Sequence, residues 1–180
     1  MRKLFLAIIA MTFITTGVNA QDSDNNGLEG AWWALGQLEY TDTEATDTQS
    51  FTILPVAGVF ISPTVTIGAG VGYTSTTVGS ADAVDAIILQ PLARKYWSIT
   101  DNFFFFGQAD VPVLLFEEAT GYGFNLRPGI DYFVTPKVTL EATFGQFGYN
   151  AVKPKEGDAT GTTSFGFNSM NVNFGIKIIL

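Results

Sequence analysis

Six charged side chains are the groups in this sequence best placed to do chemistry, since the segments around them are otherwise weakly charged. They are Arg94, Asp110, Arg127, Asp131, Glu141 and Lys177. If these segments form a closed sheet, all six side chains point into its lumen, and enclosed charges must be paired and hydrogen-bonded. We interpret them as a salt-bridge network that plugs the lumen. A gated pore and a proton-linked site are the alternatives.

Catalysis and metal binding find little support in the residue types. The chain contains no histidine and no cysteine, which removes the usual general base, the commonest metal ligand and any disulfide. Asp131 and Glu141 could form an acid–base pair, but Arg127 nearby makes ion pairing simpler. Residues 22–27 match the first half of a calcium loop, yet Trp33 stands where such a loop needs a bidentate Glu. We predict a non-enzyme with no catalytic residue, metal or cofactor.

Eight segments of alternating polarity carry these side chains. They cover residues 30–41, 49–62, 65–77, 84–98, 103–115, 121–134, 138–149 and 164–180. In the last segment Phe174, Ile176 and Ile178 share one face, whereas Asn173 and Lys177 share the other. A period of two is that of a β-strand, and each segment is long enough to cross a bilayer as a tilted strand.

The connections between the segments alternate in length. Three are tight turns, at 62–64, 100–102 and 135–137, and four are longer, at 42–48, 78–83, 116–120 and 150–163. This order is typical of an up-and-down membrane barrel with periplasmic turns and four extracellular loops. We expect 150–163 to be a mobile surface loop, and we hypothesise that the acidic loop 42–47 binds lipopolysaccharide through divalent cations.

The N-terminus has the layout of a cleavable signal peptide. Arg2 and Lys3 precede the apolar run 4–14, and Val18 and Ala20 form a small-x-small cleavage site. We therefore assign 1–20 to the signal peptide, 21–29 to a polar tether and 30–180 to the barrel. Without Arg2 and Lys3 the chain keeps seven basic against 17 acidic residues, a net charge of −10, which argues against nucleic acid as a partner.

Alternation alone does not say which face lies outside, because a soluble lipocalin-like barrel alternates too. Charged residues make up only 14% of the chain, too few for a soluble exterior. Aromatic residues also gather at both ends of the segments, as in the girdles of membrane barrels. The predicted girdles are Trp32, Trp97 and Tyr132 at the short-turn rim, and Tyr40, Tyr73 and Tyr122 at the long-loop rim. Lys95 is expected to face lipid and to extend toward the headgroups.

Three stretches, 55–73, 89–111 and 127–145, together with the closing strand 171–180, resemble a known family. It is the small outer-membrane β-barrel family typified by OmpX and the barrel of OmpA, particularly as found in Bacteroidetes. The resemblance implies an all-β, eight-stranded antiparallel up-and-down transmembrane barrel in the outer membrane. Family members commonly end in an aromatic residue that the barrel-assembly machinery reads, whereas this chain ends in Leu180.

Three functions remain open from the sequence. The first is a monomeric barrel, in contact with outer-membrane lipids and lipopolysaccharide, that supports the envelope or presents loops to an extracellular ligand. The second is a small-solute channel of the porin kind. The third is a soluble lipocalin-like carrier.

Overall fold

The computed structural model describes residues 27–166 and 172–180, and within them it contains eleven β-strands and one short 3-10 helix. The strands are β1 (Trp32–Thr43), β2 (Thr48–Ser62), β3 (Val65–Val78), β4 (Val84–Thr100), β5 (Phe103–Asp110), β6 (Val113–Phe116), β7 (Ala119–Thr135), β8 (Val138–Phe144), β9 (Gln146–Pro154), β10 (Thr160–Gly166) and β11 (Val172–Ile179). The 3-10 helix η2 (Glu44–Thr46) joins β1 to β2. No helix in the described part of the chain is long and apolar enough to cross a membrane. The predicted signal peptide and residues 21–26 of the tether lie outside the described residues.

The eleven strands form eight longer ones, because three of the predicted segments are interrupted. β5 and β6 are separated by Val111 and Pro112, yet both keep one register against β4 and β7. Pro112 has no N–H to donate to the ladder. β8 and β9 are separated at Gly145, whose φ of 78° produces a one-residue shift against β7. β10 and β11 are the two described parts of the last segment.

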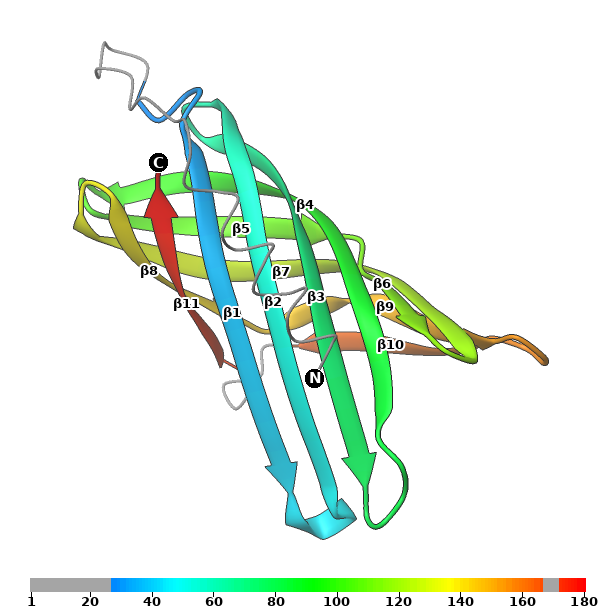
Figure 1. Ribbon diagram of the computed structural model, residues 1–180. Coiled ribbons are helices and arrows are strands. Elements are labelled where there is room, and N and C mark those ends of the chain that lie inside the picture. The colour runs from blue at the N-terminus through cyan, green and yellow to red at the C-terminus, as the bar shows by residue number, and fades with distance from the viewer. Residues whose placement is uncertain (1–26, 167–171) are drawn as a thin grey trace.

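Each of the eight long strands pairs antiparallel with the next, and the first pairs with the last (Figure 1). The closing contact joins Trp33–Gly36 of β1 to Ile176–Ile179 of β11. β11 in turn pairs with β8, and β8 pairs with β7. The prediction of an eight-stranded antiparallel up-and-down barrel is therefore confirmed.

Two of the predicted long loops are much shorter than expected. The connection predicted at 116–120 is a turn of residues 117–118, and the one predicted at 150–163 shrinks to 155–159. The missing residues pair in the ladder, where Ala119 lies opposite Pro154 and Thr160 opposite Val152. Backbone hydrogen bonds do not require apolar side chains, and threonine favours strands. The interpretation of the Thr- and Gly-rich stretch 160–163 as part of a loop is therefore wrong.

Apolar side chains cover the outside of the barrel. Ile176 is 58% exposed and Ile178 is 47% exposed, whereas Lys177 between them is fully buried. Ile179 is an apolar residue on the inward face of β11, where it packs into an apolar cluster inside the barrel. Other members of that cluster include Trp33, Leu54, Phe60, Leu92 and Phe106. The interior therefore holds an apolar part beside the charged part.

The Trp33 side chain fits inside the barrel because the residues that it faces on β2 and β3, Gly58 and Gly68, have no side chain. A Cβ atom added to Gly58 would lie 2.5 Å from the Trp33 ring and 2.5 Å from the Ile67 carbonyl oxygen. At Gly68 the same atom would lie 3.2 Å from the ring. The indole occupies space that only glycine leaves free on β2 and β3.

Candidate functional site

Five of the six predicted lumen charges are fully enclosed by the barrel. Arg94, Asp110, Asp131, Glu141 and Lys177 are each at most 3% exposed. They come from β4, β5, β7, β8 and β11, in each case from a buried position of the strand. The side-chain alternation of a strand thus directs all five into one space.

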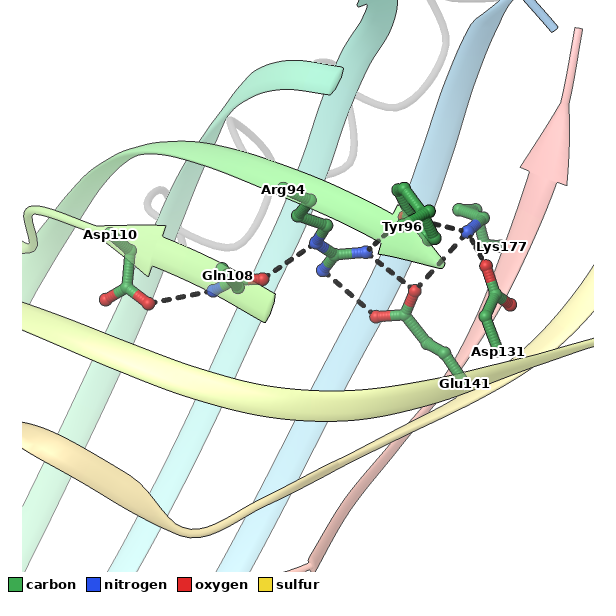
Figure 2. Close-up of polar contacts among 7 residues, drawn as sticks. All are labelled: Arg94, Tyr96, Gln108, Asp110, Asp131, Glu141 and Lys177. Atoms are coloured by element: carbon green, nitrogen blue, oxygen red, sulfur yellow. Dashed lines mark hydrogen bonds and ion pairs between the residues drawn. The ribbon is translucent and has the colours of Figure 1, made fainter. Parts of the chain in front are cut away.

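Arg94 and Glu141 form a bidentate ion pair at the centre of this space (Figure 2). Arg94 Nη1 lies 2.7 Å from Glu141 Oε2, and Nη2 lies 3.1 Å from Oε1. The third guanidinium nitrogen, Nε, donates to Gln108 Oε1 at 2.8 Å. The guanidinium carbon also lies 5.1 Å from the centre of the Trp33 ring and 4.8 Å from that of Phe106. Arg94 is therefore fixed by hydrogen bonds and by cation–π contacts with two rings.

Lys177 occupies the second half of the cluster. Its ammonium group pairs with Asp131 Oδ2, lies 3.8 Å from Glu141 Oε2 and donates to the Tyr96 hydroxyl at 3.2 Å. Arg94 Nη1 approaches the same hydroxyl at 3.5 Å. Tyr96 and Glu141 thus each contact both cations, which joins the two ion pairs into one network (Figure 2).

The network crosses the barrel from wall to wall. Tyr96 lies on the fourth of the eight long strands and Lys177 on the eighth, which are opposite one another in a closed eight-stranded sheet. Arg94 and Glu141 are three long strands apart. Their hydrogen bonds therefore span the lumen rather than follow its wall. An eight-stranded barrel is narrow enough for side chains to fill its interior in this way.

Amide side chains extend the network toward the loop end. Gln108 Nε2 donates to Asp110 Oδ2 at 2.8 Å, and Asn125 Nδ2 lies 3.3 Å from Asp110 Oδ1. Asn125 Oδ1 accepts hydrogen bonds from Gln146 at 2.6 Å and from Asn150 at 2.9 Å. These uncharged members were not predicted. Their inward position follows from the period of two, since Gln108 and Tyr96 are each two residues from a predicted lumen charge.

Arg127 is the sixth predicted charge, and it stands at the edge of the network. Its Nε lies 3.3 Å from Asp110 Oδ2, but the angle is not that of a hydrogen bond and 23% of the side chain is exposed. Arg127 does not contact Asp131 or Glu141 within the ion pairs of the described residues. The sequence interpretation that Arg127 would pair with these two carboxylates is wrong, because Lys177 and Arg94 pair with them instead.

The six predicted girdle residues lie on the outer wall near the strand ends. At the short-turn rim Trp32, Trp97 and Tyr132 are each about half exposed. Trp97 packs against Phe105, with 5.7 Å between ring centres. At the opposite rim Tyr40 is 62% exposed and Tyr122 is 43% exposed, and Tyr73 is partly buried. The structure places both sets of rings outward, and their contact with a membrane interface stays a proposal.

Comparison with solved structures identifies the fold. The chain is similar to the N-terminal β-barrel domain of Pseudomonas aeruginosa OprF, with a TM-score of 0.51 and 10% identity. The match covers 84% of this chain and 98% of that domain. The chain shares its fold with this β-barrel domain. A de novo designed transmembrane β-barrel also matches, with a TM-score of 0.49 and 13% identity over 86% of this chain and 99% of the design. No family model and no curated protein matches the sequence.

Proposed function

We propose that the protein is a non-enzymatic integral barrel of the outer membrane with a plugged lumen. In this proposal it acts in membrane structure and integrity or in surface interaction through its loop-end connections. The observation that carries the proposal is the polarity of the barrel, which has charged side chains inside and apolar side chains outside. The similarity to the OprF barrel domain supports the same fold-level conclusion.

The outer wall supports a location in lipid. Large apolar side chains on several strands are more than 40% exposed, among them Val71, Ile87, Leu140, Phe174 and Ile176. Contiguous apolar surface of this kind is rare on soluble monomers, and each square ångström exposed to water costs about 25 cal/mol. A soluble lipocalin-like carrier would turn its apolar face inward. The apolar side chains exposed on the outer wall therefore argue against that alternative.

The cross-lumen network supports a plug rather than an open channel. A solute passing the level of Arg94 and Glu141 would have to separate a bidentate pair whose side chains are 0% and 2% exposed. Breaking such a pair leaves two buried charges without partners and costs several kcal/mol. The small-solute channel remains the second candidate only if the network opens under a membrane potential.

The loop end supports a role in surface contacts. The β3–β4 and β6–β7 hairpins diverge there (Figure 1), and a hollow of about 1000 Å³ opens between them. Its wall includes Tyr73 and Leu115, and its rim carries Asp85, Glu117 and Glu118. Among the described residues, no group of three acidic side chains could hold a metal ion by itself. If the loop end contacts lipopolysaccharide through divalent cations, the phosphates of the lipid would therefore supply some of the ligands of each cation.

Reconstitution of the purified mature protein tests both parts of the proposal. A folded membrane barrel should enter phospholipid vesicles, resist extraction without detergent and migrate differently on gels before and after heating. In planar bilayers the same preparation should show no stable open conductance. Recovery in the soluble fraction would overturn the membrane location, and steady open channels would overturn the plug.

A further inference from the structure

Lys95 is an exception on the outer wall of the barrel. The outward positions of β4 from Ile87 to Ile99 are Ile87, Leu89, Pro91, Ala93, Lys95, Trp97 and Ile99. Lys95 also lies beside two uncharged residues, Val65 on β3 and Gly107 on β5. A lysine on an apolar, lipid-facing wall carries a free-energy cost that rises with its depth in the membrane. Its presence there calls for a partner.

The outer wall is hollowed directly beside Lys95. A depression of about 480 Å³ is lined by Lys95 and by small or apolar residues that include Ala93, Gly107, Ala109 and Phe147. Arg94, Gln108 and Arg127, which belong to the network inside the barrel or its edge, also contribute to the lining. The hollow exists because glycine and alanine occupy neighbouring outward positions on β4 and β5. A Cβ atom added to Gly107 would meet only the Trp97 ring, at 3.6 Å. The depression is therefore open to the surroundings of the barrel.

The ammonium group of Lys95 is directed from the hollow toward the short-turn rim. Its Nζ donates a hydrogen bond at 2.5 Å to Oγ1 of Thr64, which lies in the β2–β3 turn. No carboxylate of the described residues forms an ion pair with Lys95. The two arginines that also line the hollow, Arg94 and Arg127, pair with Glu141 and Asp110. The site thus combines a largely apolar groove along the wall with one cation, at its short-turn end, that no protein carboxylate of the described residues balances.

We propose that this site binds one glycerophospholipid of the membrane leaflet at the short-turn rim. The phosphate accepts a hydrogen bond from the Lys95 ammonium, and an acyl chain lies in the hollow over Gly107 and Ala109. An anionic headgroup supplies the charge that the protein does not, and the acyl chain covers apolar wall that small side chains leave recessed. The proposal rests on the membrane location proposed above, and it adds a specific ligand to it.

Native mass spectrometry of the mature protein, released from lipid-free detergent micelles, tests the site. Phosphatidylglycerol added in small excess should give a species with one bound lipid. Lys95→Gln should lower its occupancy about tenfold, the order of one charge-assisted hydrogen bond, and Lys95→Arg should restore it. Gly107→Leu should lower occupancy as well, because the side chain fills the hollow. Lys153→Gln is the matched control, since Lys153 is an exposed lysine near the loop end, and it should leave binding unchanged.

Two ligand controls separate the parts of the site. Diacylglycerol with the same chains lacks the phosphate, and glycerol phosphate lacks the chains, so both should bind at least about tenfold more weakly. Equal binding by wild type and Lys95→Gln, or equal binding of diacylglycerol and phosphatidylglycerol, would overturn the inference. The heat-dependent gel shift of the same samples distinguishes the two failures. A shifted, folded barrel without lipid discrimination refutes the lipid site alone, whereas a protein that is folded without detergent refutes the membrane location.

Discussion

Removing one partner of the ion pair between Arg94 and Glu141 should strongly destabilise the barrel. Glu141→Gln keeps the shape of the side chain and one acceptor oxygen, but it removes the charge that balances Arg94. Among the described ion pairs, Arg94 has no other carboxylate partner, and Gln108 satisfies only its Nε. Removing one partner of a buried pair costs about 3–5 kcal/mol. Because the shape is preserved, we expect about 3 kcal/mol for Glu141→Gln.

Urea unfolding from phospholipid vesicles, followed by tryptophan fluorescence and by the gel shift, measures this loss. The variant should unfold at lower urea with an unchanged slope, which reports stability rather than a change in the exposed surface. Glu118→Gln is the matched control, because Glu118 and Lys155 form an ion pair at 3.2 Å with side chains 77% and 64% exposed. An exposed pair of this kind contributes about 0–1 kcal/mol.

The double variant Arg94→Met with Glu141→Met distinguishes charge pairing from packing. Replacing both charges by apolar side chains of similar length removes the buried charges together, and such replacements are often neutral. We therefore expect the double variant to be more stable than Glu141→Gln. If Glu141→Gln unfolds at the same urea concentration as Glu118→Gln, the reasoning that the pair is buried and unscreened is refuted.

Two further changes test the packing inside and the polarity outside. Gly58→Ala should destabilise the barrel by about 1–3 kcal/mol through overpacking against Trp33. Gly36→Ala is the control, because a Cβ atom at Gly36 would meet nothing within 4 Å. Equal unfolding midpoints for the two variants would contradict the packing described here. Ile176→Arg, at an outward position that is 58% exposed, should cost about 2 kcal/mol in vesicles if that position faces lipid. An unchanged unfolding curve would indicate an outer wall in contact with water.

The period of two in the sequence was sufficient to predict the eight long strands, and together with the low charge content it predicted the inward face of those strands that alternate cleanly. It predicted that Lys177 and Glu141 point inward because residues on either side of them are apolar. It could not predict that Lys177 would pair with Asp131 or that Tyr96 would lie between the two cations. Those contacts cross the lumen, and they depend on the stagger of strands that are distant in sequence.

The extents of the loops and the apolar part of the interior were less accessible to sequence reasoning. Thr160 and its neighbours resemble a loop in composition, but they lie in β10 because β9 offers a complete ladder of backbone groups. β2 is apolar on both faces, so alternation does not reveal that Leu54 and Phe60 are the inward residues. Their direction becomes evident only from the pairing of β2 with β1 and β3.

Quenching of tryptophan fluorescence by brominated phospholipids tests the central claim most directly, since the chain has three tryptophans. Trp32 and Trp97 lie on the outer wall and are 50% and 49% exposed, whereas Trp33 is 0% exposed inside the barrel. In vesicles, Trp33→Phe should leave two residues that brominated chains quench strongly. Trp32→Phe with Trp97→Phe should leave one residue that they quench weakly. Strong quenching of Trp33 alone, or no quenching in any variant, would contradict a membrane barrel with its apolar face outward.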